Sequence, residues 1–348
     1  MSRNPLTRIN PKYTTRLIAV LLAALLCLGV YRVFIVEGGN VSEKPGNDLN
    51  GTPDNNAENI DNSTGGETEN DADNDDEQNI QDSDSMYKDN GAEVLRNQLS
   101  AQSAILCNNL KNTVISKKSE KTPVTSAAVL SLSVALTVME AIAVGEISPS
   151  DRAVCPASAI RLPCYQSSSS IISVGQSLTV AELVKCMLCA DPWLYAHTLA
   201  IHTGGGEQAF LDRMNALMRD LGVKNTFYRS VSDPNAQSTT ALDAAVIFRA
   251  AMENQTLRSL LTTSQSFTVS ASGNAWNTFT LCNRFYSECC TEGQARADGI
   301  VGGYYCESEG KEFVFMLFEQ GGVEHITVAM CSDTAYADSL ILLSRALR

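Results

Sequence analysis

Hydrophobic residues are distributed very unevenly along this chain of 348 residues. Residues 17–36 are almost continuously apolar, which is long enough for one membrane-spanning helix. From residue 37 to residue 89 apolar side chains are scarce, and from residue 90 onward they recur with the spacings of helices and strands. The pattern therefore divides the chain into a tail at 1–16, an anchor at 17–36, a linker at 37–89 and a folded domain at 90–348.

Within the folded domain, the pattern predicts strands at both ends and helices between them. Two short runs, Ser103–Cys107 and Val114–Ser116, flank a polar turn and predict a hairpin. Residues 127–144 are apolar at nearly every position, which predicts a central buried helix. The remaining predictions are helices at Thr179–Cys189, Leu194–His202, Glu207–Asp220, Ala241–Met252 and Thr334–Leu347, and a second hairpin of Phe313–Phe318 with His325–Met330. Strands at both ends indicate an α+β fold in which they share one antiparallel sheet.

Flanking charges orient the predicted anchor. Arg3, Arg8, Lys12 and Arg16 precede it and acidic residues follow it, so the positive-inside rule places the N-terminus in the cytoplasm. We therefore expect a single-pass protein of the cytoplasmic membrane with an extracytoplasmic folded domain. A cleaved signal peptide is the alternative, although no clear small-x-small cleavage site follows the apolar run.

The linker concentrates the negative charge of the chain. Between Asn40 and Met86, fourteen Asp or Glu residues stand against Lys44 alone, a net charge of −13, which equals the net charge of the whole protein. Such a segment buries too little apolar surface to fold, so we expect a disordered tether that holds the domain away from the membrane. The charges elsewhere cancel, and no basic stripe indicates binding of nucleic acid.

Ten cysteines lie in the predicted folded domain, and an oxidising compartment would allow disulfides between them. Cys155 and Cys164 flank a proline-containing loop and form the leading candidate disulfide. Other possible pairs are Cys282 with Cys289 or Cys290, and Cys306 with Cys331. Cys186 and Cys189 have the spacing of a zinc or redox motif, but no second Cys-x-x-Cys completes four ligands. Buried thiols are therefore favoured over a metal site, and no cofactor is predicted.

Three short motifs in the second half of the chain carry a family resemblance. Residues 221–226 read Leu-Gly-Val-Lys-Asn-Thr, residues 238–243 read Ser-Thr-Thr-Ala-Leu-Asp, and residues 298–300 read Asp-Gly-Ile. With the apolar helices around them, these segments resemble the D-alanyl-D-alanine carboxypeptidase family of low-molecular-weight penicillin-binding proteins over about residues 101–348. The resemblance implies a serine β-lactamase-like fold, in which helices flank a five-stranded antiparallel sheet and form a helical subdomain.

In that family a Ser-x-x-Lys turn at the start of the buried helix supplies the nucleophile and its base. Two alignments of this turn are open here. One places Thr125 at the serine position and Ala128 at the lysine position, and the other uses Ala128 and Ser131. Neither contains a base, and the chain has no lysine between Lys121 and Lys185.

The other two family motifs have also lost the atoms that the chemistry requires. Asp191 and Trp193 replace the serine and asparagine of the Ser-x-Asn loop, which assists proton transfer in the family. Val301, Gly302 and Gly303 stand where Lys-Thr-Gly holds the substrate carboxylate. Serine acyl transfer needs an activated hydroxyl and stabilisation of the oxyanion, so the sequence predicts a protein without the family's catalysis.

The leading interpretation of function is a membrane-anchored, degenerate carboxypeptidase homologue. We expect it to bind peptidoglycan stem peptide, or a cell-wall synthesis protein, without turnover, through the backbone edge of the strand at Ile300–Gly303. An alternative is a purely structural interaction module whose cleft is filled by Trp193 and Val301.

A third hypothesis is an active serine-type D-Ala-D-Ala carboxypeptidase with a non-standard site. Its nucleophile would be Thr125 or Ser126 paired with Asp191, or the thiol of Cys189. No histidine lies near these residues in the sequence to support them.

Overall fold

The computed structural model describes residues 85–162, 171–190, 192–233, 237–272 and 278–347. The predicted tail and anchor, and nearly all of the predicted linker, lie outside these residues. The described residues all belong to one compact unit. Within the described part of the chain, no helix is both long enough and apolar enough to span a membrane.

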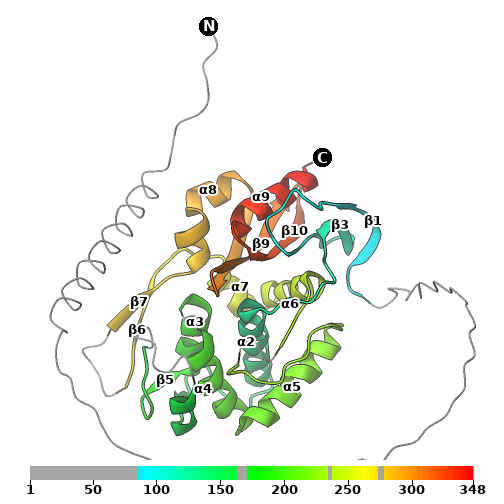
Figure 1. Cartoon of the computed structure of the whole chain (residues 1–348). Coiled ribbons are helices and arrows are strands. Elements are labelled where there is room, and N and C mark those ends of the chain that lie inside the picture. The colour runs from blue at the N-terminus through cyan, green and yellow to red at the C-terminus, as the bar shows by residue number, and fades with distance from the viewer. Residues whose placement is uncertain (1–84, 163–170, 191, 234–236, 273–277, 348) are drawn as a thin grey trace, which may run out of the picture. The chain divides into compact units, whose positions relative to one another are not determined.

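Six strands of the described chain form one central sheet, in the order β1-β3-β2-β10-β9-β8 (Figure 1). The strands are β1 (Lys88–Val94), β2 (Ser103–Asn108), β3 (Thr113–Lys118), β8 (Ile300–Ser308), β9 (Lys311–Gln320) and β10 (Val323–Ser332). β10 pairs antiparallel with both β2 and β9. The two ends of the folded unit therefore share one sheet, which confirms the predicted α+β class.

β1 is a sixth strand that the sequence pattern did not reveal, and it pairs parallel to β3. Its residues are mostly exposed, so they lack the apolar alternation that marks a half-buried strand. It begins at Lys88, earlier than the domain boundary expected at residue 90. Tyr87 precedes it and is only 1% exposed, with its hydroxyl 2.6 Å from Asn109 Oδ1 and the Arg249 guanidinium over its ring. The folded domain thus includes residues that composition assigned to the linker.

Tyr87→Phe tests how much this attachment contributes. We expect the free energy of unfolding to fall by about 1 kcal/mol, because one hydrogen bond is lost while the buried ring stays in place. Urea denaturation of the purified protein measures the change. Asn109→Ala should cost a similar amount, and the double variant should cost no more than either one if the two side chains act as a pair.

Helices cover both faces of the sheet (Figure 1). α2 (Ala127–Ala143) and α6 (Ala241–Glu253) pack on one face, and α9 (Ala335–Ala346) packs on the other. Alternate residues of β9 serve the two faces: Phe315 lies in the core with α2, whereas Met316 lies in the core with α9. The predicted central helix is confirmed as α2, which is buried along most of its length.

A helical subdomain lies below the sheet in Figure 1, and smaller elements precede and follow it in the chain. Its helices are α3 (Val180–Cys189), α4 (Pro192–Gly204) and α5 (Glu207–Asp220). The smaller elements are β4 (Arg152–Val154), η1 (Ala157–Arg161), β5 (Ser177–Thr179), α7 (Gln255–Leu261), β6 (Phe267–Ser270), β7 (Thr278–Leu281), η4 (Phe285–Cys289) and α8 (Glu292–Ala297). α3, α4 and α5 agree with the predicted helices to within two residues at each end, whereas α7 and α8 were not predicted.

Cysteine pairing differs from two of the expectations. Cys306 and Cys331 form no disulfide with each other, because β9 lies between the strands that carry them. Cys282, Cys289 and Cys290 also form no disulfide, so neither alternative partner is bonded to Cys282. Cys282 lies close to Cys189 of α3, whereas the end of η4 packs toward α9. Neither pair is therefore bonded. Cys164 lies outside the described residues, so its pairing with Cys155 stays a prediction.

Candidate functional site

In the first alignment of the nucleophile turn, the residue at the serine position, Thr125, lies far from the third motif. Thr125 is exposed and lines a cavity of about 450 Å³ together with Ser308 and Lys311, at the far end of β8. Gly302 lies six residues earlier on the same strand, roughly 20 Å away at the rise of a β-strand. Lys311 Nζ hydrogen-bonds Asp333 at 2.6 Å. Thr125 is therefore separated from the position where the family binds its substrate.

The second alignment does place α2 beside the third motif, but it supplies no reactive group. Ala128 and Ser131 are fully buried. The Ser131 hydroxyl donates to Ala127 O at 3.1 Å and also hydrogen-bonds the Tyr304 side chain, one residue after Gly303. Burial raises the pKa of the Tyr304 phenol well above its usual value, so the phenol stays neutral. The groups beside the third motif are therefore the methyl group of Ala128, the hydrogen-bonded hydroxyl of Ser131 and the neutral phenol of Tyr304.

The glycines of the third motif are required by packing. A Cβ on Gly302 would lie 2.6 Å from Leu261 O and 2.8 Å from Thr262 Cα, at the end of α7. A Cβ on Gly303 would lie 2.6 Å from the Phe285 ring. Backbone atoms therefore fill the space into which a threonine side chain at position 302 would extend.

Side chains from the segment after β7 cover the edge of β8, the outermost strand of the sheet. Asn283 Nδ2 donates to Gly303 O at 3.2 Å and to Leu261 O at 3.0 Å. The Tyr286 hydroxyl lies 3.3 Å from Val301 O and 3.1 Å from Thr262 O. The protein's own side chains bind these two carbonyls, and the addition of a peptide to this strand edge stays a prediction.

The other residues considered for a non-standard site are also unreactive or not described. Ser126 is buried and accepts a hydrogen bond from Val129 N, so it caps α2. Burial raises the pKa of Cys189 to about 12, which keeps it a thiol rather than a nucleophilic thiolate. Trp193 is partly buried and packs against the core. Asp191 lies outside the described residues.

Cys186 and Cys189 do not form a metal site with other described residues. Burial raises the pKa of Cys186 to about 12 as well, and both thiols lie in the core on α3. Within the described ranges, no three His, Cys, Asp or Glu side chains are grouped so that they could hold a metal ion.

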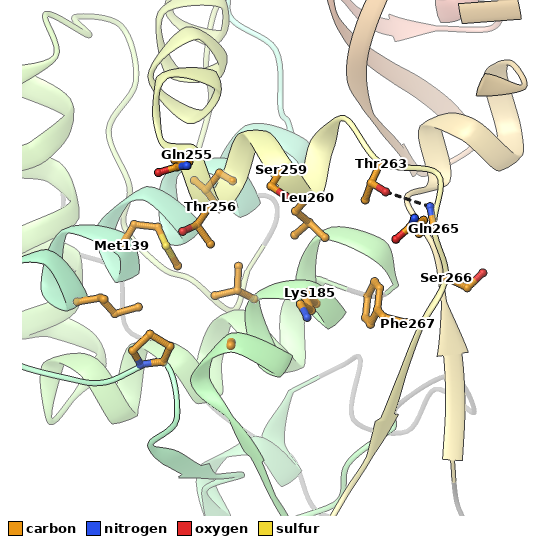
Figure 2. A pocket seen from close by; sticks show the side chains of 15 residues that line it. Met139, Lys185, Gln255, Thr256, Ser259, Leu260, Thr263, Gln265, Ser266 and Phe267 are labelled. Atoms are coloured by element: carbon orange, nitrogen blue, oxygen red, sulfur yellow. Dashed lines mark hydrogen bonds between the residues drawn. The ribbon is translucent and has the colours of Figure 1, made fainter. Parts of the chain in front are cut away.

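An open cavity of about 550 Å³ lies between α2, α3, α7 and β6 (Figure 2). Met139, Val184 and Leu260 give it an apolar interior. Lys185 is the one charged side chain among the described residues that line it, and its Nζ lies 5.3 Å from the centre of the Phe267 ring. Hydroxyl and amide groups surround these residues, including Thr256, Ser259, Thr263 and Gln265. The cavity combines an apolar surface, a cation and several hydrogen-bonding groups, as small-molecule sites do.

The sequence did not single out Lys185, because a lysine on an amphipathic helix is usually a solvated residue. Only the packing of α7 and β6 against α3 turns its side chain into a cavity wall. The polar residues of Gln255–Ser266 did not indicate a binding site in the sequence, since polar side chains are common in a short helix and the loop after it.

Two of the three motifs that match the family, residues 221–226 and 238–243, meet at one buried carboxylate. Asp243 Oδ2 accepts hydrogen bonds from Asn225 N at 2.7 Å and from Thr226 Oγ1 at 2.8 Å. Its side chain thus joins the Leu-Gly-Val-Lys-Asn-Thr loop to the start of α6. Burial raises the pKa of Asp243 despite these bonds. These two motifs therefore hold the loop at residues 221–226 against the start of α6.

Comparisons with known proteins agree with this architecture. A family model described as D-alanyl-D-alanine carboxypeptidase matches residues 89–334. The D-alanyl-D-alanine carboxypeptidase DacF of Bacillus subtilis is 23% identical over 159 residues, a match that covers 45% of this chain and 40% of that relative.

Two solved structures share the fold. A D-alanyl-D-alanine carboxypeptidase from Mycobacterium tuberculosis superposes with a TM-score of 0.60 at 21% identity, covering 74% of this chain and 96% of that one. A mutant of a Streptomyces DD-transpeptidase gives a TM-score of 0.61 at 19% identity, covering 72% of this chain and 98% of that one.

Proposed function

Because the chain belongs to the D-alanyl-D-alanine carboxypeptidase family, we propose that it is a non-catalytic member that binds peptidoglycan stem peptide without cleaving it. In this proposal the N-terminal segment anchors it in the cytoplasmic membrane and the folded domain is extracytoplasmic. A cell-wall synthesis protein is the other partner to test.

The packing at Gly302 carries the non-catalytic part of the proposal. If only a catalytic residue had been replaced, a neighbouring side chain could take over its role. Here the end of α7 fills the space in which the family's threonine side chain would lie. The covered carbonyls of Val301 and Gly303 support the same conclusion, because a substrate held along this strand edge would need them.

The cavity beside Lys185 supports binding at a shifted position. Its volume of about 550 Å³ lies within the roughly 300–1,000 Å³ of small-molecule sites. A stem peptide combines small apolar side chains with free carboxylates. Its methyl groups fit the surface formed by Met139, Val184 and Leu260, and a carboxylate would pair with the Lys185 ammonium.

Two measurements on the purified protein test this function together. A fluorescent penicillin should leave no covalent label after denaturation. Calorimetry with a stem pentapeptide should show binding that Lys185→Ala weakens by about tenfold or more, because a hydrogen bond between charged groups contributes about 1.5–3 kcal/mol.

Lys111→Ala is the matched control, since Lys111 lies in the exposed turn between β2 and β3 and should leave the affinity unchanged. A penicillin label mapped to α2 would contradict the non-catalytic proposal. A folded protein that binds no pentapeptide would contradict the ligand and leave a cell-wall protein as the partner to pursue.

A further inference from the structure

Hydrogen bonds away from the three motif positions link a serine to a carboxylate through a histidine. Ser158 lies in η1, His197 in α4, and Glu207 at the start of α5. His197 Nε2 lies 2.8 Å from Ser158 Oγ, and its Nδ1 lies 2.8 Å from Ser232 Oγ. Ser232 Oγ is 3.4 Å from Glu207 Oε1, and Glu207 Oε2 is 3.9 Å from His197 Nδ1. These four side chains come from four separate segments and form one continuous hydrogen-bonded series.

The carboxylate gives this series a direction. Glu207 Oε1 accepts hydrogen bonds from Ser230 Oγ at 2.9 Å and from a loop amide at 3.0 Å, so it is fixed as the acceptor end. When Ser232 donates to Glu207, its oxygen can accept from the Nδ1–H of His197. The lone pair of Nε2 then faces the hydroxyl of Ser158. In this arrangement an imidazole can take a proton from a serine.

The serine of this series is accessible to a substrate, whereas the histidine is shielded from water. His197 is only 4% exposed, Ser158 is partly exposed, and Arg161 is exposed three residues further along η1. Burial, together with the charge of Arg161, lowers the pKa of His197 below its usual value, while Glu207 raises it. The imidazole is therefore neutral at pH 7 and available as a base.

We propose that Ser158 is a nucleophile with His197 as its general base, and that they form a second site which cleaves small carboxylic esters. Ser232 and Glu207 are positioning residues, because they act on the substrate only through His197. Arg161 places a positive charge beside the serine. This site is independent of the inherited cleft, since none of its residues belongs to the three family motifs.

The reaction balances without any cofactor. The Ser158 hydroxyl transfers its proton to His197 Nε2 while its oxygen forms a bond to the acyl carbon. The ester C–O bond then breaks, and the departing alkoxide takes the proton from His197. Water hydrolyses the acyl-serine in the reverse sense, with its proton passing to His197 and then to the Ser158 oxygen. The products are an alcohol and a carboxylic acid.

A fluorophosphonate probe tests the nucleophile in the full-length protein. We expect the label on Ser158, by mass spectrometry of the labelled peptide, and its loss in Ser158→Ala. Ser287→Ala, which removes an exposed serine of η4, should label as the wild type does. Hydrolysis of p-nitrophenyl acetate should be lost in Ser158→Ala, which removes the nucleophile, and should fall by about 10²-fold in His197→Ala, the lower end of what general-base catalysis contributes.

The pH profile separates a catalytic histidine from a structural one. Glu207 on α5 and Arg161 on η1 are the charged groups that act on His197. The labelling rate should rise with pH through a midpoint below 6.5, as the imidazole loses its proton. Glu207→Gln keeps the acceptor oxygen but removes the charge that raises the pKa of His197, so the midpoint should move lower still and the rate above it should fall.

Two outcomes would overturn the proposal. One is a folded wild-type protein that takes no label, and the other is a Ser158→Ala variant that labels as fast as the wild type. Either result would show that the series only ties η1 to α4 and α5.

Discussion

Gly302→Ala is expected to lower the free energy of unfolding by about 3 kcal/mol, the upper part of the usual range for adding a methyl group to a packed core. The reason is that the new Cβ would meet backbone atoms of Leu261 and Thr262 at 2.6 and 2.8 Å, and backbone cannot rotate away as a flexible side chain can. Restoring the family motif with Val301→Lys and Gly302→Thr should cost more and should not restore penicillin binding.

Urea denaturation and a fluorescent penicillin measure these two results. Gly293→Ala is the matched control, because Gly293 lies within α8 and a Cβ there would meet nothing within 4 Å. This control should stabilise the protein by about 0.5–1 kcal/mol through helix propensity. If Gly302→Ala were as stable as the wild type, α7 would be able to move aside, and loss of the motif would no longer imply loss of the site.

The elements that could be predicted from sequence are those whose patterns are local. The continuous apolar run of α2 and the two hairpins show their period within a few residues, so their positions agree with the structure. β1 could not be found in this way, because its residues are mostly exposed and its place in the sheet is set by pairing with β3, next to the buried Tyr87. A strand that is placed by contacts with other segments need not show the alternation of apolar and polar residues in its own sequence.

The candidate site likewise has features that the local sequence shows and features that only the fold shows. Replacement of the family lysine by Val301 is visible in the sequence, whereas the reason for Gly302 depends on where α7 ends. Ser158 and His197 are 39 residues apart. No spacing rule joins them, since only the packing of η1 on α4 brings them together. The sequence could indicate which chemistry was lost, but not which groups the fold assembles elsewhere.

Asp243→Ala is expected to lower the free energy of unfolding by about 4 kcal/mol. The carboxylate is 3% exposed and accepts hydrogen bonds from the partly buried Asn225 N and from Thr226 Oγ1, which also lies 2.8 Å from Thr239 Oγ1. Its removal loses both bonds to a charged group, and each such bond contributes about 1.5–3 kcal/mol. Asp243→Asn retains one acceptor oxygen and should cost about half as much. Chemical denaturation measures both, and Asp212→Asn on the exposed face of α5 should change stability by less than about 0.5 kcal/mol.

The pH dependence of this difference tests the electrostatics of Asp243 separately from its hydrogen bonds. Burial raises its pKa in the folded protein above the ordinary value of 3.8, so the folded state binds a proton at a higher pH than the unfolded state does. The stability that this shift contributes is therefore complete below pH 3.8 and is lost as the pH rises through the folded-state pKa. The difference in unfolding free energy between the wild type and Asp243→Asn should accordingly grow as the pH falls from neutrality toward 3.8. A difference that shrank over this range would mean that the hydrogen bonds from Asn225 and Thr226 outweigh burial, and that the loop holds the carboxylate mainly by charge.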